Sequence, residues 1–592
     1  MTKAEEFYSS RQAKYIDLKN QISKKLVFSS TLRLFVFLAI CAEIYFFFGN
    51  INILLPLTIL LIAVFIYLVS RHTDFKKEKE KLVALININE RELKILKTRD
   101  FSDLPDGKKF DPEDHDYSRD IDLFGKKSFF QYLNRTALKE GKERLAKILL
   151  ANKTVDILKK QEAVKELASK ADWRQNYTAT AKLVKTETES KQILSWIRNY
   201  KSFVPKYMKW FPAVFTLASI AVFFIYYLGI IGASQVLLWF LVGLMITGFF
   251  FKKVNDLSAK VSMVQDTFQQ YHQLLAFIET ENFDSELMKE VKTSITSESK
   301  KASVILKEFS RAIDSLDQRN NFLFGVLANG FFLWDLRHSY RLEKWIEHHH
   351  TAVEHWFEAV ERTDAYNSLG NFAFNHQTYT YPEILPAGEG IKAKNLGHPL
   401  LDAGKRINND FEIDGKQFFI ITGANMAGKS TFLRTIALQI LMSNIGLPVC
   451  AENCKYAPVK LITSMRTSDS LGDDESYFFS ELKRLKYIVE KIQTENYFII
   501  LDEILKGTNS TDKAIGSRKF VQRLVGSNST GIIATHDLSL CEISNELQQV
   551  KNFYFDAEIV NDELHFDYHL KDGICQNMNA SFLLRKMKIV EV

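Results

Sequence analysis

The sequence is poor in cysteine and proline, and its charges nearly balance. The five cysteines among 592 residues stand far apart, one of them inside an apolar segment. We therefore expect no disulfide framework and predict a reducing compartment. A net charge of +6 is too small at this length to indicate a nucleic-acid binder, so any basic groove must be local. Because 46% of the residues are hydrophobic and 25% are charged, global disorder is excluded.

A secretory signal peptide is also lacking, since residues 1–28 are polar, charged and helical in pattern. Long apolar runs follow instead. Residues 29–48 and 51–70 are each close to the length of about 20 residues that spans a bilayer as a helix. Residues 211–251 contain no charged residue and are interrupted at Gly232-Ala-Ser-Gln235, which fits two more spans. The pattern predicts four transmembrane helices in two hairpins, with burial in a soluble core as the alternative.

Basic residues flank these runs on the side of the long polar segments, whereas both hairpin tips are uncharged. The flanking residues are Lys24, Lys25, Arg71, Lys76, Lys77, Lys201, Lys206, Lys209, Lys252 and Lys253. The chain is thus predicted to be a multi-pass protein of the inner, or cytoplasmic, membrane with both termini in the cytoplasm. Glu43, inside the first run, is expected to face another span, with an ion pathway as the alternative. The short apolar stretch 322–334 is predicted to be a buried helix.

A phosphate-binding loop stands at the centre of the cytosolic sequence. Four apolar residues, 418–421, form a predicted buried strand, and Gly423-x4-Gly428-Lys429-Ser430 follows directly and opens an apolar-periodic helix. Glycines allow backbone N–H groups to approach phosphate oxygens, Lys429 reaches the β- and γ-phosphates, and Ser430 is a ligand of Mg²⁺. The predicted ATP-binding residues are Gly423, Ala424, Asn425, Met426, Ala427, Gly428, Lys429, Ser430 and Thr431.

Two further strands end in polar residues that hydrolysis requires. The apolar run 497–501 ends in Asp502 and Glu503, and the run 531–535 ends in His536. We expect Asp502 to support Mg²⁺ together with Ser430, and Glu503 to orient or deprotonate the attacking water. His536 is expected to sense the γ-phosphate. Glu503, His536 and Lys429 are therefore the predicted catalytic residues.

These residues together resemble the MutS family of ATPases. The similar segments are Thr422-Gly-Ala-Asn-Met-Ala-Gly-Lys-Ser-Thr431, Asp502-Glu-Ile-Leu-Lys-Gly-Thr508, Ser476-Tyr-Phe-Phe-Ser-Glu481, Ala534-Thr-His536, and Gly397-His-Pro-Leu-Leu401 followed by Asn409-Asp410. The resemblance implies an α/β P-loop NTPase head of the ABC type, ATP and Mg²⁺ as cofactors, a homodimer through the heads, and DNA as a partner. It also implies that Ser476 acts on the neighbouring subunit's nucleotide and that His398 and Asn409 flank the adenine.

The resemblance continues upstream, where it implies a mainly α-helical core or lever domain. Leu123-Phe-Gly125, Leu133-Asn-Arg-Thr136 and Glu162–Leu167 resemble the start of that domain, and Asp364–Leu369 resembles its end. The second membrane hairpin is then inserted within the lever. We expect no counterpart of the family's mismatch-reading amino-terminal domain, whose place the apolar runs occupy, or of its dimerising helical tail. Three positions depart from the family pattern: Ala427 for glycine, Gly397 for arginine, and Lys513 for a small residue.

The predicted division has six segments. These are a cytosolic amino-terminal helix (1–28), the first transmembrane hairpin (29–70), a cytosolic helical segment with the start of the lever (71–207), the second hairpin (208–251), the lever continuation (252–375) and the ATPase domain (376–592). The predicted function is a membrane-anchored ATPase that hydrolyses ATP in dimerised heads and is coupled to DNA binding, in mismatch repair or in sensing DNA structure. An ATP-driven transporter and an ATP-binding membrane scaffold without turnover are the alternatives.

Overall fold

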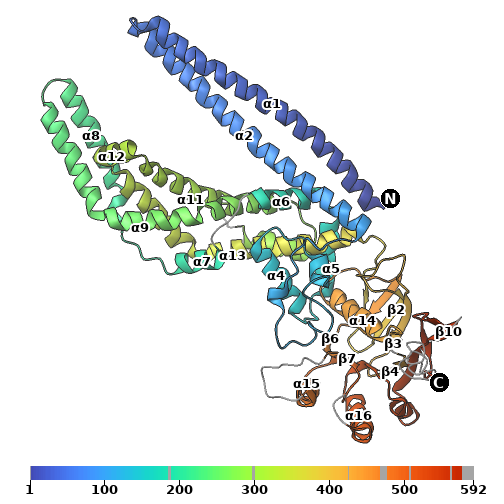
Figure 1. Cartoon of the computed structure of the whole chain (residues 1–592). Helices are drawn as coiled ribbons and strands as arrows, with labels where there is room; N and C mark the ends of the chain where they lie inside the picture. Colours follow the sequence, from blue (N-terminus) through green and yellow to red (C-terminus); the bar gives the residue numbers. More distant parts are fainter. Residues whose placement is uncertain are drawn as a thin grey trace.

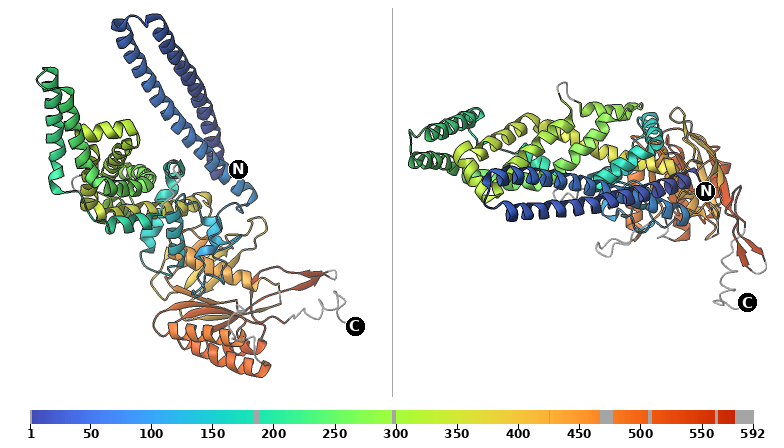
Figure 2. Two further views of the ribbon diagram at one scale, coloured as in Figure 1. Left: turned by 60° about the vertical axis from the view of Figure 1, so that its left-hand side comes forward. Right: turned by 90° about the horizontal axis from the view of Figure 1, so that it is seen from above.

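The computed structural model describes residues 2–183, 189–296, 300–424, 426–466, 477–505, 509–560 and 563–576. Helices make up the amino-terminal two thirds, and a mixed α/β domain follows from residue 383 onward (Figure 1). Two helical hairpins project from the helical region on the side away from the α/β domain (Figure 2). Two predicted site residues, Asn425 and Ser476, lie outside the described residues.

The first hairpin consists of two very long antiparallel helices, α1 (Lys3–Phe47) and α2 (Ile51–Thr98). Helix α1 begins with a capping box, in which Thr2 and Glu5 satisfy each other's backbone N–H groups. The turn between the helices falls at residues 48–50, next to the expected break at Gly49-Asn50. Both helices run without interruption from the apolar half of the hairpin into the polar half.

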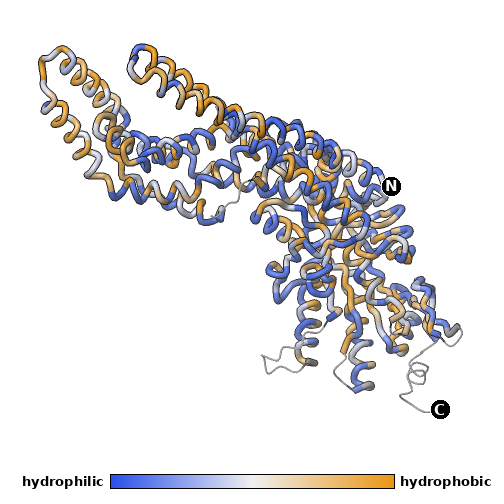
Figure 3. Tube along the Cα trace, turned by 45° about the horizontal axis from the view of Figure 1, so that its top comes forward, coloured by the Kyte–Doolittle hydropathy of each residue, from blue (hydrophilic) through white to orange (hydrophobic). Residues whose placement is uncertain are grey.

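The second hairpin is formed by α8 (Phe211–Tyr227) and α9 (Ala233–Thr280), with Gly232 at the amino-terminal cap of α9. Among the described residues, three helices are long and apolar enough to cross a membrane, namely α1, α2 and α9. Helix α8 contains no charged residue but has only 17 residues. Apolar residues cover the distal ends of both hairpins (Figure 3), where most large hydrophobic side chains are exposed.

Helix α12 (Phe322–Phe332) corrects one prediction, because the stretch 322–334 is not a buried helix. Phe322 is 77% exposed and Leu323 is 70% exposed. The helix packs on one side against α8 and α9, where a Cβ on Gly243 would clash with the carbonyl of Gly330, and a Cβ on Gly330 would clash with the ring of Phe240. An apolar helix without a polar face carries no signal of what covers it, so the sequence alone did not distinguish a protein core from another apolar environment.

The remaining helices pack around α13 (Trp334–Asn375), which contacts α4, α5, α9 and α11. We call this helical region the lever, after the domain predicted for it from the sequence. The others are α3 (Phe129–Leu133), α4 (Lys139–Leu150), α5 (Ile157–Ser169), α6 (Ala171–Leu183), α7 (Ser190–Arg198), α10 (Glu286–Ser294) and α11 (Ala302–Asp317), with short 3-10 helices at Lys108–Phe110, Lys206–Lys209 and Gln318–Asn320.

A buried polar cluster joins the first hairpin to the lever. Glu92 on α2 is 1% exposed and accepts a hydrogen bond from Arg135 Nε at 2.5 Å. Its other carboxylate oxygen accepts from Asn375 Nδ2 at 3.0 Å and from Asn371 Nδ2 at 3.3 Å, and Tyr8 of α1 donates to Asn375 Oδ1 at 2.7 Å. We call these five residues the Glu92 cluster. Burial alone would raise the pKa of Glu92, but the neighbouring arginines lower it to about 2.

The α/β domain contains a six-stranded sheet in the order β12-β9-β4-β8-β7-β6. All of its neighbouring strands are parallel except β12, which is antiparallel to β9. The strands are β4 (Phe418–Gly423), β6 (Lys460–Ser464), β7 (Tyr497–Asp502), β8 (Thr530–Ala534), β9 (Val550–Phe555) and β12 (Leu570–Asp572). The helices are α14 (Lys429–Asn444), α15 (Tyr477–Lys491) and α16 (Ser510–Val525), with a 3-10 segment at Leu538–Asn545.

A second, four-stranded sheet has the order β1-β5-β2-β3 and lies between the lever and the larger sheet. Its strands are β1 (Glu383–Ile384), β2 (Ile391–Leu396), β3 (Asn409–Ile413) and β5 (Asn453–Tyr456). A small hairpin of β10 (Glu558–Val560) and β11 (Glu563–His565) completes the described strands.

Candidate nucleotide-binding site

Three central strands bring their carboxyl ends to one edge of the large sheet. Ile421 of β4 pairs with Ala534 of β8, which in turn pairs with Asp502 of β7. The residues that follow each strand therefore lie side by side. Ligands of open parallel sheets bind at this kind of edge, where neighbouring strands lead into separate loops.

The loop after β4 has a backbone that only glycine adopts readily at two positions. Gly423 has φ 147°, and a Cβ there would lie 2.6 Å from the carbonyl oxygen of Phe555. Gly428 has φ 101°, and a Cβ there would lie 2.9 Å from Tyr568 Cδ1. Between them, Ala427 is buried, whereas Met426 is 78% exposed with φ 70°. The glycines thus allow the close backbone approach that phosphate binding requires.

Lys429, the first residue of α14, is held within this loop. Its Nζ donates to the carbonyl oxygens of Gly423 at 2.7 Å and Ala424 at 3.0 Å, and lies 3.3 Å from His536 Nε2. Burial lowers the pKa of Lys429, since its ammonium group is only partly compensated by the carboxylates of Asp502 and Glu503. The ammonium group is thus fixed at the carboxyl edge of the sheet.

The predicted metal ligands lie next to each other. Ser430 Oγ donates to Asp502 Oδ2 at 2.7 Å, which brings a hydroxyl and a carboxylate oxygen to one point. Oxygen donors of this kind are the ligands that Mg²⁺ prefers. The residues present therefore fit a magnesium ion bound with phosphate. Thr431, the next residue, is exposed on the first turn of α14.

Glu503 and His536 form a hydrogen-bonded pair, with 2.9 Å between Glu503 Oε1 and His536 Nε2. Both side chains are about a quarter exposed, so each is positioned yet accessible. Glu503 has φ 55°, a conformation uncommon outside glycine, and its backbone N–H donates to the carbonyl of Ala534 at 2.9 Å. Backbone of this kind is often found at functional sites.

The two residues predicted near the adenine have different surroundings. Asn409 binds the segment that follows β11, donating to Tyr568 O at 3.0 Å and accepting from Leu570 N at 2.7 Å. Tyr568 contacts the loop at Gly428, so Asn409 supports a wall of the site. His398 instead lies among the charges of Arg434, Arg406 and Asp122, and burial lowers its pKa to about 4.

Sequence reasoning did not identify Tyr568 or the full role of Glu481. Tyr568 has φ 55°, is 43% exposed and stacks with Phe566 at the open side of Gly428. Glu481, at the end of the segment that begins with Ser476, is buried and accepts a hydrogen bond from the backbone N–H of Leu505 at 2.5 Å. The motif had indicated Glu481, whereas no local pattern distinguishes Tyr568 from other surface tyrosines.

Comparisons with known proteins match the part of the chain that contains this site. Residues 419–589 match the family model for MutS domain V. The chain is 33% identical over 213 residues to human MutS protein homolog 4, covering 34% of this chain and 22% of that protein. It is 32% identical over 213 residues to DNA mismatch repair protein MutS of Fusobacterium nucleatum, and 34% identical over 208 residues to DNA mismatch repair protein Msh2 of Dictyostelium discoideum.

These alignments cover 34% and 33% of this chain and 23% and 22% of the two relatives. The chain therefore spans less than a quarter of the length of these relatives. The carboxy-terminal third of the chain is thus similar to the ATPase domain of MutS-family proteins.

Proposed function

We propose that this protein is a membrane-anchored ATPase that binds and hydrolyses Mg²⁺-ATP at the carboxyl edge of the large sheet. The observation that carries the proposal is the convergence of Lys429, the Ser430–Asp502 pair and the Glu503–His536 pair at this edge. Each group has a role in phosphoryl transfer, and the three strand ends bring them together without help from any other domain.

Each group of residues at this edge would have its own role in ATP hydrolysis. Backbone N–H groups of residues 423–431 and the amino terminus of α14 bind the phosphates, and Lys429 moves from backbone carbonyls to phosphate oxygens. Ser430 and Asp502 hold Mg²⁺, which neutralises charge that builds up on the phosphates. Glu503 takes a proton from the attacking water, and His536 keeps the Glu503 carboxylate oriented.

The exposed apolar surfaces of the two hairpins support the proposal that the protein is anchored in a bilayer. Helices α1, α2 and α9 have the length and composition of spans, and α8 and α12 extend the same exposed apolar surface around α9. Exposed apolar surface on this scale is not stable in water. With four spans arranged as two hairpins, the basic flanks favour a cytoplasmic α/β domain and cytoplasmic termini.

The lever would couple the two ends of the molecule. Helix α13 runs from α12 to residue 375, just ahead of the α/β domain, and its last turns carry Asn371 and Asn375 of the Glu92 cluster. A shift of the ATPase head that moves the end of α13 therefore also acts on the first hairpin. Conformational changes of this type need a rigid element between two sites, which a 42-residue helix supplies.

Dimerisation and DNA binding are proposed from the relatives. Two of the proteins described above are named as DNA mismatch repair proteins, and residues 419–589 of this chain match the model for MutS domain V. Pairing of two heads would bring Ser476 of one chain to the nucleotide of the other. Binding of duplex DNA by the lever is expected to weaken steeply with salt, because phosphate contacts release counterions.

The central test is the substitution Glu503→Gln in the full-length protein in nanodiscs. The variant should bind ATP as tightly as the wild type, while its kcat falls at least about 100-fold because the general base is lost. Glu490→Gln on the exposed face of α15 is the matched control and should leave turnover unchanged. Unchanged turnover in E503Q would contradict the role of Glu503.

Two further outcomes separate the alternatives. Wild-type protein that binds Mg²⁺-ATP but completes no single turnover would be a scaffold rather than an ATPase. ATP-dependent flux of solutes into sealed liposomes, with no salt-sensitive DNA binding, would indicate a transporter.

A further inference from the structure

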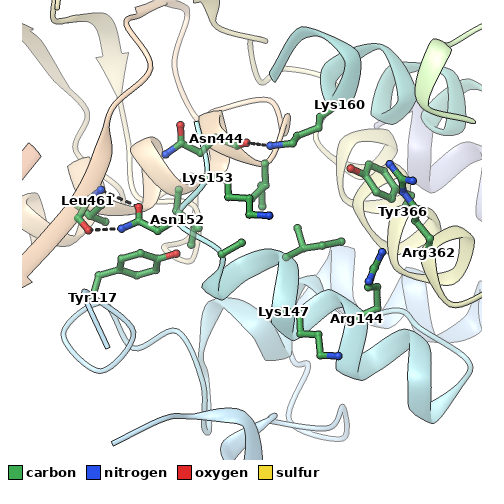
Figure 4. A pocket seen from close by; sticks show the side chains of 14 residues that line it. Tyr117, Arg144, Lys147, Asn152, Lys153, Lys160, Arg362, Tyr366, Asn444 and Leu461 are labelled. Atoms are coloured by element: carbon green, nitrogen blue, oxygen red, sulfur yellow. Dashed lines mark hydrogen bonds between the residues drawn. The ribbon is translucent and has the colours of Figure 1, made fainter. Parts of the chain in front are cut away.

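A cavity of about 380 Å³ lies at the junction between the lever and the ATPase domain. Its lining comes from the lever helices α4, α5 and α13, from the carboxyl end of α14 and from the start of β6 (Figure 4). Helix α14 has 16 residues and begins at Lys429, so the cavity lies about 24 Å along that helix from the nucleotide site. The two sites are therefore separate.

Five cationic side chains line this cavity and no carboxylate does. They are Arg144, Lys147, Lys153, Lys160 and Arg362. Arg144 forms an ion pair with Glu358 at 2.7 Å, and Lys160 Nζ donates to the carbonyl oxygen of Asn444 at 3.0 Å. Within the described part of the chain, Lys147, Lys153 and Arg362 have no carboxylate partner within ion-pair distance. The cavity thus holds a local excess of positive charge in a chain of nearly balanced charge.

The cavity has apolar walls as well as charge. Ile148, Leu441, Ile445 and Leu461 form its apolar surface, and the ring of Tyr366 closes one side. Burial raises the pKa of Tyr366 to about 12, so its hydroxyl remains a hydrogen-bond donor at neutral pH. In Figure 4 Lys153 points toward the centre of the view, with Arg144 and Arg362 on the Tyr366 side. Convergent polar groups over an apolar wall are typical of small-molecule sites.

The walls are held in place by hydrogen bonds across the domain junction. Asn152, just after α4, accepts from Leu461 N at 2.9 Å and donates to Leu461 O at 2.9 Å and to Asp116 Oδ2 at 2.8 Å. Lys160 ties α5 to the end of α14 in the same way. The cavity is therefore preformed, and its two halves belong to the two bodies that ATP hydrolysis would move.

We infer that this cavity binds a small organic phosphate of about the size of a nucleoside monophosphate. Its phosphate group would lie among Lys153, Arg144 and Arg362, and its ring system against Tyr366 and the apolar wall. Because the lining comes from both the lever and the ATPase domain, the ligand stabilises one relative placement of the two and regulates turnover from outside the nucleotide site.

The test uses adenosine 5′-monophosphate and adenosine as a charged and an uncharged probe. Isothermal titration is done on the full-length protein in nanodiscs, with the nucleotide site saturated by Mg²⁺ and a non-hydrolysable ATP analogue. We expect one molecule of the monophosphate per chain and at least about 10-fold weaker binding of adenosine, because two or more charge-assisted hydrogen bonds are absent. Equal affinity for the two probes, or no binding of the monophosphate, would overturn the inference.

Variants of the cavity lining test whether the monophosphate binds in this cavity. The double variant K153E/R362E should weaken monophosphate binding at least about 10-fold. Lys289→Glu, on the exposed face of α10, makes one charge reversal of the same kind elsewhere and should have no effect. If the double variant proves poorly folded, Arg362→Lys alone replaces it. This variant retains the charge but loses the bidentate hydrogen bonding of arginine, so it should bind the monophosphate more weakly than the wild type does. Monophosphate binding that survives K153E/R362E would place it elsewhere.

Duplex DNA is a competing ligand for this cavity, and the same experiments distinguish it from a small organic phosphate. If the cavity instead recognises the backbone of duplex DNA, a short duplex will displace the monophosphate and K153E/R362E will lose duplex binding to the same extent. That result would replace the small-molecule assignment. If the duplex leaves monophosphate binding unchanged, the assignment stands.

Discussion

Replacing Glu92 by glutamine should loosen the junction between the first hairpin and the lever. Glu92 is fully buried, and its carboxylate receives hydrogen bonds from Arg135, Asn371 and Asn375. The amide keeps the shape but removes the charge, so the arginines are left buried without their partner. Breaking one side of a buried ion pair typically costs about 3–5 kcal/mol.

The pKa of Glu92 gives a second measure of the same interaction. It is lowered from 4.5 to about 2, which corresponds to about 3 kcal/mol of folded-state preference for the charged form. Since the folded pKa lies below the unfolded one, this stabilisation is fully present above pH 4.5 and is lost as the pH falls toward 2. Both arguments predict that E92Q is less stable than the wild type at neutral pH.

Hydrogen exchange read by mass spectrometry measures this directly in the intact protein. Amides of residues 4–15 and 85–97 should exchange about 100-fold faster in E92Q than in the wild type at pH 7. The ratio should approach one as the pH is lowered from about 4.5 to 2, because the wild type then loses the same interaction. Glu90→Gln, an exposed neighbour on the same helix, is the control and should change exchange little. A ratio near one at pH 7, or one that does not change with pH, would refute the reasoning.

Two further predictions concern the nucleotide loop and α12. Gly423→Ala should weaken ATP binding, measured by titration, at least about 10-fold. The alanine Cβ would lie 2.6 Å from Phe555 O, and the φ at this position disfavours alanine. Gly404→Ala is the control and should leave ATP binding unchanged. For α12, a polarity-sensitive fluorophore is attached to a cysteine introduced by Leu323→Cys in a C41S background. This label should show the emission of an apolar environment and should be quenched by spin-labelled lipids. The same label at Lys307→Cys is the control and should show neither effect. A label at residue 323 that reports water, while the hairpins remain in the bilayer, would show that α12 lies outside it.

Most of the nucleotide site was predictable because each part is a local pattern. An apolar strand followed by Gly423-x4-Gly428-Lys429-Ser430 specifies its own loop, and polar residues directly after parallel strands must meet at one edge of the sheet. Asp502, Glu503 and His536 were found in this way. Tyr568 was not, because its place beside Gly428 depends on a chain segment that returns to the loop from about 140 residues further along.

The Glu92 cluster could not be predicted from sequence. Its five residues are spread from Tyr8 to Asn375, and their contacts depend on how α1, α2 and α13 pack. The basic cavity escaped sequence reasoning for the same reason, because Arg144, Lys153 and Arg362 read as ordinary solvated charges within their own helices. Tertiary packing decides which polar residues become buried, and periodicity does not record it.

The two apolar hairpins leave the helical region at separate places on the same side of the molecule (Figures 1 and 2). If both hairpins are embedded in a bilayer, two separate attachments limit the tilt of the helical region relative to the membrane plane more than one attachment would. The chain can still rotate about the membrane normal and diffuse within the plane. Two copies would then keep their α/β domains at the same height, so that an encounter between these domains would depend on rotation and lateral diffusion alone.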